Sequence, residues 1–153
     1  TAAICKKGSL EEKCISANEV VKNLSNSCTI RFGKKSPGTT LLLARKVDDK
    51  FELASVGDSY IMKLSNKVEI INDRHEDQYG YLTAYIGMQE PIKVWKGCVD
   101  LKVGDRYMLV TDGIDALTDK KKLLDCINAE QVIDEVLKTS AYDNITCIYI
   151  DVK

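Results

Sequence analysis

Two short stretches constrain the fold of this chain more than any other feature of its sequence: GDRYMLVTDGIDALT at Gly104–Thr118 and YDNITCIYI at Tyr142–Ile150. In the first, an apolar run ends at Thr-Asp-Gly and passes into a helical segment. In the second, Asp-Asn comes first and an apolar strand follows. If the two strands are antiparallel neighbours in one sheet, the end of one and the start of the other share an edge, and Asp112 and Asp143 converge there.

The convergence of Asp112 and Asp143 points to a metal site. Two carboxylates at one sheet edge repel each other unless a cation lies between them. Oxygen ligands of this kind suit a hard divalent ion such as Mg²⁺ or Mn²⁺. Each residue also has a simpler interpretation, since Asp112 could cap the helix that follows it and Asp143 with Asn144 could form a turn before the strand.

Composition indicates one globular domain that spans residues 1–153. The chain is 44% hydrophobic and 29% charged, which is typical of a soluble protein with a core. Its net charge is −1 and its basic residues are scattered, so we expect no nucleic-acid partner. No apolar run approaches the roughly 20 residues of a membrane span, so we expect no membrane partner.

The six cysteines form no CxxC motif and no pair with zinc-ligand spacing. We interpret them as reduced structural residues, which favours an intracellular, cytoplasmic location. The chain begins at Thr1 without a methionine, and we therefore expect that it is a piece of a longer protein.

The first part of the chain predicts a helix. Ser9 and Glu12 have the spacing of a capping box, and an apolar stripe then recurs at helical spacing as far as Leu24. We expect this helix to end near residues 25–26, followed by a short strand at Cys28–Phe32 and a turn at Gly33–Gly38.

The rest of the chain is rich in predicted strands joined by short connections. Short connections favour an antiparallel meander, with a hairpin turn at Val47–Lys50. Helices are expected at Leu82–Ile86, after Asp119 and after Asn128. The pattern as a whole predicts an α+β layered sandwich of two antiparallel sheets flanked by helices. The predicted strands are Thr39–Arg45, Phe51–Val56, Tyr60–Leu64, Lys67–Ile71, Ile92–Val99, Tyr107–Val110 and Ile145–Ile150.

Five motifs, taken in order, carry a family resemblance. They are GTTLLLARK at Gly38–Lys46, ELASVGDSYIMKL at Glu52–Leu64, YLTAYIGM at Tyr81–Met88, LKVGDRYMLVTDGIDALTD at Leu101–Asp119, and YDNITCIYI. In this order and spacing they resemble the metal-dependent protein serine/threonine phosphatases of the PP2C type, particularly the compact bacterial ones. The resemblance covers residues 38–153.

The resemblance implies a sandwich of two antiparallel sheets with a two-metal centre at one edge. In such a centre, a water activated by two Mg²⁺ or Mn²⁺ ions attacks the phosphorus of phosphoserine or phosphothreonine in a phosphoprotein substrate. Asp112 and Asp143 match the carboxylates that bind metal directly, and Asp58 matches a weaker, additional metal position. Gly57, Gly113 and Asn144 match supporting positions, where Gly113 lets the backbone pass close to the site.

The chain also departs from the family pattern. The N-terminal DG-x-GG turn, whose aspartate bridges both metals, is absent, as are the upstream acidic residue and arginine. Tyr60 stands where an arginine is common. Ala116 stands at a later acidic position, with Asp115 one place early, so a third ion is not expected. Either the chain is part of a longer enzyme, or it is a catalytically inactive regulatory module that binds a protein partner.

Two further groups of charged residues have open interpretations. His75, the single histidine, could be a general acid, and Glu76 and Asp77 could be substitute metal ligands; all three could equally be solvated loop residues. Lys120–Lys122 could attract an acidic phosphopeptide or simply form the solvated start of a helix.

Overall fold

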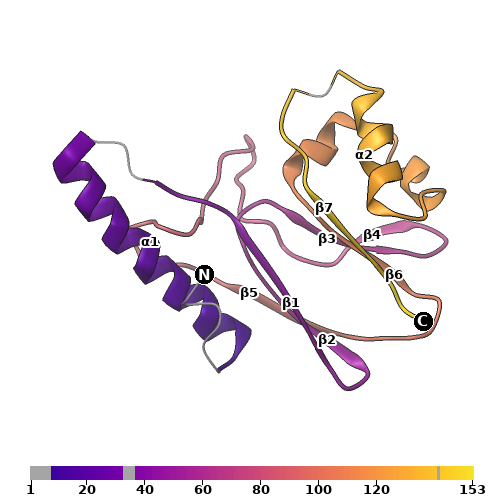
Figure 1. The fold of residues 1–153 in the computed structure, drawn as a ribbon, viewed down its shortest axis with the longest axis horizontal. Helices are drawn as coiled ribbons and strands as arrows, with labels where there is room; N and C mark the ends of the chain where they lie inside the picture. The colour runs from indigo at the N-terminus through magenta and orange to yellow at the C-terminus, as the bar shows by residue number, and fades with distance from the viewer. Residues whose placement is uncertain (1–7, 33–36, 141) are drawn as a thin grey trace. The chain divides into compact units, whose positions relative to one another are not determined.

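The computed structural model describes residues 8–32, 37–140 and 142–153, with side chains outside 25–32 (Figure 1). The chain forms two compact units, which are described here one at a time. The first unit comprises Thr1–Asp58 and Asp73–Val99, and the second comprises Ser59–Asn72 and Asp100–Lys153.

The first unit combines one long helix with a three-stranded sheet of order β1-β2-β5 (Figure 1). β1 and β2 form the predicted hairpin, in which Leu41 pairs with Val56 and Val47 with Lys50. The helix begins at the predicted capping box: Ser9 N–H donates to the Glu12 carboxylate at 2.8 Å, and Glu12 N–H donates to Ser9 Oγ at 3.2 Å. The elements are α1 Leu10–Phe32, β1 Leu41–Val47, β2 Lys50–Val56 and β5 Trp95–Asp100.

The apolar stripe of α1 packs on this sheet. Leu10, Cys14 and Ala17 are buried in one cluster with residues of β2 and of the 84–86 segment. The stripe continues through half-buried Val21, which packs against this cluster, and ends before Leu24, which was predicted to belong to it but is 55% exposed. The helix therefore presents its first half to the core of this unit.

Two predictions for this part of the chain are wrong: the end of the helix near residues 25–26, and the strand at Cys28–Phe32. Cys28–Phe32 is not a strand, because α1 continues to Phe32. Asn26 and Ser27 are weak helix formers but do not break a helix, and the first strong breaker after them is Gly33. Most of the predicted turn at Gly33–Gly38 lies outside the described residues.

The segment Leu82–Ile86 is also not the predicted short helix. It forms two isolated bridges, Glu76 with Leu82 and Thr39 with Ile86. A five-residue run between two glycines, Gly80 and Gly87, is too short to nucleate a helix when extended partners are available.

The second unit contains a four-stranded sheet of order β4-β3-β6-β7 (Figure 1). β6 pairs with β7 in the predicted antiparallel manner, with Val110 opposite Cys147 and Arg106 opposite Asp151. Its elements are β3 Tyr60–Leu64, β4 Val68–Ile70, β6 Arg106–Val110, η1 Asp112–Ala116, η2 Lys120–Leu124, α2 Ala129–Leu137 and β7 Cys147–Asp151.

The helices of the second unit begin at the predicted caps. The Asp119 carboxylate accepts from Lys121 N–H, and the Asn128 side chain accepts from Gln131 N–H at 2.9 Å. Val132 and Val136 of α2 are buried in one core cluster with Met62, Met108 and other residues of the sheet. This core holds β6, and therefore the start of η1, in a fixed place within the unit.

The expectation of a continuous meander is wrong at one point. β2 and β3 belong to different sheets, so the chain changes sheet at Gly57–Ser59. The predicted class is nevertheless confirmed: the described residues form an α+β fold with two antiparallel sheets and two α-helices. In the part of the chain that the structure describes, no helix is long and apolar enough to cross a membrane.

Candidate functional site

The end of β6 and the start of β7 lie side by side, as the two motifs predicted. Beyond the last strand pair, Thr111 N–H donates to Thr146 O at 3.1 Å, and Thr146 N–H donates back to Thr111 Oγ1 at 3.0 Å. The Thr111 side chain thus replaces a backbone acceptor and extends the pairing one step past the strands. Asp112 and Asp143 follow and precede this junction, respectively.

Gly113 makes the junction close. A Cβ atom at this position would stand 2.4 Å from the Asn144 carbonyl oxygen and 2.9 Å from its carbon. Thr111 Oγ1 also lies 3.4 Å from the Asn144 carbonyl oxygen, as a donor. Only glycine leaves room for this approach of the two backbones, which is the role that the sequence suggested for Gly113.

The two aspartates differ in their surroundings. Asp112 is half-buried and is the first residue of η1, whereas Asp143 is exposed. The capping residue of η1 is Thr111, whose side chain makes no capping hydrogen bond, so the simpler interpretation of Asp112 as the N-cap is wrong. Asp143 Oδ1 accepts from Asn144 N–H at 2.7 Å, which is the local turn contact that was its simpler interpretation.

The chemistry of this edge fits a hard cation through two carboxylates. Carboxylate oxygens are the ligands that Mg²⁺ and Mn²⁺ prefer. Within residues 8–32, 37–140 and 142–153, no group of three or more His, Cys, Asp or Glu side chains gathers at one place. The carboxylates of Asp112 and Asp143 by themselves would be fewer oxygen ligands than such an ion requires.

Asp58 belongs to the first unit, where its loop is held by the segment 74–75. Gly57 has φ +112°, and a Cβ there would come 2.4 Å from the Thr40 side chain. Gly57 N–H donates to His75 Nδ1 at 3.1 Å, and His75 N–H donates to Gly57 O at 2.9 Å. Arg74 Nε donates to Asp58 O. Three hydrogen bonds thus fix the backbone of the Gly57-Asp58 turn.

His75 is buried, so its interpretation as a solvated loop residue is wrong. Only 7% of its surface is exposed, and burial lowers its pKa. A neutral imidazole whose Nδ1 accepts from Gly57 carries its proton on Nε2. Glu76 forms an ion pair with Arg74 at 2.7 Å, and Asp77 accepts from the N–H groups of Tyr79 and Tyr81.

Tyr60 and Asp115, two positions where the sequence departs from the family pattern, contact each other. The Tyr60 hydroxyl lies 2.6 and 2.8 Å from the two Asp115 carboxylate oxygens, and Lys120 Nζ lies 2.9 Å from Oδ1. The Lys120 ammonium also lies 5.6 Å from the centre of the Tyr60 ring. The sequence did not predict this cluster. The feature that could have indicated it is that Tyr60 and Asp115 both replace expected residues inside family motifs.

The chain belongs to the protein phosphatase 2C family. The family model for Protein phosphatase 2C matches residues 6–144, which is most of the chain. Comparison with curated proteins gives no match.

Solved structures show the same fold at low identity. PppA, a key regulatory component of T6SS in Pseudomonas aeruginosa, matches with a TM-score of 0.81 and 19% identity, over 94% of this chain and 70% of its own. The S. agalactiae serine/threonine phosphatase matches with a TM-score of 0.75 and 21% identity, over 94% and 71%. The catalytic domain of the serine/threonine phosphatase PstP, in complex with two manganese ions, matches with a TM-score of 0.77 and 19% identity, over 99% and 78%. The predicted fold is thereby confirmed.

Proposed function

We propose that this chain carries the metal-binding edge of a metal-dependent serine/threonine phosphatase that acts on phosphoproteins. The observation that carries the proposal is the junction of the TDG and DNIT segments. Thr111 and Thr146 bond reciprocally, and Gly113 meets Asn144 without room for a side chain. Asp112 follows Thr111 and Asp143 precedes Asn144 in the chain, which supports the proposal that both carboxylates serve one metal-binding edge.

Asp112 and Asp143 would hold Mg²⁺ or Mn²⁺, and Asp58 would contribute to a weaker position. Two ions bound there would supply a hydroxide-like water and neutralise charge on the phosphate oxygens. The role of this chain's own residues is to present oxygen ligands on a rigid frame. The buried strand β6 and the close contact at Gly113 provide that frame.

The test is Mn²⁺-dependent hydrolysis of a phosphothreonine peptide by this chain and by its Asp112→Asn and Asp143→Asn variants. We expect activity that requires Mn²⁺ and falls by at least about 10²-fold in either variant, because each substitution removes a charged ligand. Calorimetric Mn²⁺ titration provides a second readout, in which both variants bind more weakly. Asp125→Asn, which makes the same charge change at an exposed position in another loop, serves as the control.

A second candidate is a PP2C-like regulatory module that binds a protein partner without catalysis. It is favoured by the absence of a DG-x-GG motif from the sequence and by the lack of a three-ligand cluster among the described residues. Neither Mn²⁺ uptake nor hydrolysis is expected on this alternative. Metal binding that Asp112→Asn and Asp143→Asn both abolish would exclude the regulatory module as an account of this sheet edge.

A further inference from the structure

A basic pocket lies beside η2 in the same unit as Asp112 and Asp143. Its volume is about 360 Å³. Half-buried Val68 and Leu124 give it an apolar part, and the turn before β4 and the start of η2 supply its polar residues. The lining residues are Asn66, Lys67, Val68, Asp119, Lys120, Lys121 and Leu124.

Positive charge dominates this pocket, with three lysines and one aspartate. The Asp119 carboxylate also accepts from Lys121 N–H at 3.1 Å, so part of it is engaged with the backbone. The Lys67 side chain is 70% exposed, and its Nζ lies 3.9 Å from Glu69 Oε2, with which it forms a long ion pair. Lys67 and Lys121 are both exposed, so their ammonium groups can turn toward an anionic group.

Lys120 connects the pocket to the candidate metal edge. Its ammonium binds Asp115 at 2.9 Å, and Asp115 lies in η1, the helix that begins at Asp112. The partners of Lys120 are thus internal, while Lys67 and Lys121 are the two lysines available to a ligand. Lys67 lies in the part of the pocket farther from that edge, because Val68 pairs with Leu64, opposite Arg106, whereas Tyr60 pairs with Val110 at the edge. A substrate bound at the sheet edge would therefore reach this pocket with residues some way along its chain from the phosphorylated one.

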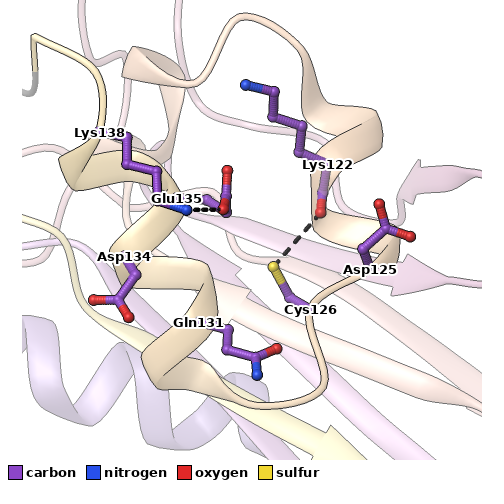
Figure 2. Close-up of a pocket in the computed structure, with 7 residues that line it drawn as sticks. All are labelled: Lys122, Asp125, Cys126, Gln131, Asp134, Glu135 and Lys138. Carbon is purple, nitrogen blue, oxygen red and sulfur yellow. Dashed lines mark hydrogen bonds and ion pairs between the residues drawn. The ribbon is translucent and has the colours of Figure 1, made fainter.

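The next lysine, Lys122, lines a different pocket of about 460 Å³, shown in Figure 2. Three carboxylates line that pocket, those of Asp125, Asp134 and Glu135, and Glu135 is paired with Lys138 (Figure 2). Consecutive lysines of η2 thus contribute to pockets of opposite charge character. Lys121 and Lys122 form a matched pair for experiment.

We propose that the pocket of Lys67, Lys120 and Lys121 binds an acidic segment of the phosphoprotein substrate, about five residues along the chain from its phosphorylated residue. The proposal rests on the proposed function, since it names the substrate class of that site. The argument is charge complementarity together with an apolar floor: aspartate or glutamate side chains would face Lys67 and Lys121, and an aliphatic side chain would cover Val68 and Leu124.

The experiment measures binding of fluorescent phosphothreonine peptides to the full chain by polarisation. One peptide carries a run of aspartate and glutamate about five residues from the phosphothreonine, and the other carries serine and glutamine there. We expect the acidic peptide to bind at least about fivefold more tightly at low salt, and the difference to shrink at high salt because exposed charges are screened. Lys121→Glu and Lys67→Glu should each reduce this preference about three- to tenfold, whereas Lys122→Glu, with the same charge change, should preserve it.

Three results would overturn the proposal. The two peptides could bind with equal affinity, or Lys121→Glu and Lys122→Glu could have equal effects. A short oligonucleotide, which is a polyanion without carboxylates, could also compete for the pocket as well as the acidic peptide does. Circular dichroism and a thermal melt verify that each exposed variant is folded. Failure here is distinguishable from failure of the proposed function. Mn²⁺-dependent hydrolysis without a Lys121-dependent peptide preference would contradict only the role proposed for the pocket. A Lys121-dependent preference without Mn²⁺ uptake would contradict only the proposed phosphatase function.

Discussion

Gly113 shows at the scale of a single residue how the candidate site depends on backbone contact. The two motif segments approach so closely there that a methyl group would stand 2.4 Å from a backbone oxygen, that of Asn144. Backbone cannot move aside as the end of a flexible side chain can. The close approach, and not a special backbone conformation, is what demands glycine.

We therefore predict that Gly113→Ala lowers the free energy of unfolding by about 1–3 kcal/mol, the usual cost of overpacking. Urea denaturation provides the measurement. Thr118→Ala, an exposed position in the same segment, is the control and should change stability by no more than about 0.5 kcal/mol. A Gly113→Ala protein as stable as the wild type would show that the two segments are not held together in this way.

His75 is the second residue whose environment matters, because it fixes the turn that carries Asp58. Its replacement by alanine leaves the buried Gly57 N–H without its acceptor, which costs about 1–3 kcal/mol. His75→Gln can return an amide oxygen to the same N–H and should recover part of this loss. Equilibrium unfolding of the two variants separates the hydrogen bond from side-chain volume.

The same residue predicts a pH dependence of stability. Burial is the largest influence and lowers the His75 pKa, with Lys93 acting in the same direction and the Gly57 hydrogen bond and Asp73 opposing it. Below about pH 6.5 the unfolded chain binds a proton at His75 more readily than the folded chain does. The free energy of unfolding therefore falls as the pH is lowered, until the lower folded pKa is reached. We expect the free energy of unfolding to drop between pH 7.5 and 5.5 in the wild type and to drop less in His75→Gln. An identical drop in both would assign the effect to other groups.

At the scale of elements, the contact between β3 and β6 is secured by a polar cluster around Asp105. Lys63 of β3 stands opposite Tyr107 of β6. Its ammonium lies 2.8 Å from Asp105 Oδ2 and 5.4 Å from the centre of the Tyr107 ring, and the Tyr107 hydroxyl lies 3.1 Å from the same carboxylate oxygen. The Lys63 hydrogen bond is the main cause of a lowered Asp105 pKa.

We predict that Asp105→Asn destabilises the chain by about 1 kcal/mol at pH 7, because it removes a partly buried ion pair between neighbouring strands. The pKa of Asp105 is depressed below 3.8, so its contribution is present above that pH and is lost as pH falls through the folded pKa. The difference between variant and wild type should therefore shrink at pH 3. Glu69→Gln, which touches only an exposed pair at 3.9 Å, is the control and should have no measurable effect.

At the scale of the whole molecule, the sheet edges decide how the chain behaves in solution. β7 pairs with β6, and among the described strands no other pairs with its second edge. Ile148 in this strand is 57% exposed. An apolar edge strand is a template for pairing with another chain.

We accordingly expect concentration-dependent self-association, measurable by size-exclusion chromatography with light scattering. Ile148→Lys should shift the equilibrium toward monomer, because a lysine on an edge opposes edge-to-edge pairing. Leu137→Lys, at a residue that is 61% exposed but lies on α2, should leave association unchanged. A monomer at every concentration, or equal effects of the two substitutions, would contradict this prediction.

Much of the fold could be predicted because it rests on local contacts. The capping box of α1, the caps at Asp119 and Asn128, and the β1–β2 hairpin all join residues a few positions apart. The antiparallel pairing of β6 with β7 could be predicted as well, from the apolar runs that end in TDG and begin after DN. Family motifs added the expected identity of the site.

The tertiary structure alone decided where residues with several possible partners would go. Nothing near Gly57–Ser59 in the sequence shows that the chain changes sheet there, because strands in either sheet have the same alternation and turn lengths. The burial of His75, the bond between Tyr60 and Asp115 and the continuation of α1 to Phe32 depend likewise on groups or breakers outside the local pattern. Hydrogen bonds between near neighbours can be predicted from the spacing of residues in the sequence. Burial and long-range pairing are decided only in the folded chain, where separate elements compete for the same partners.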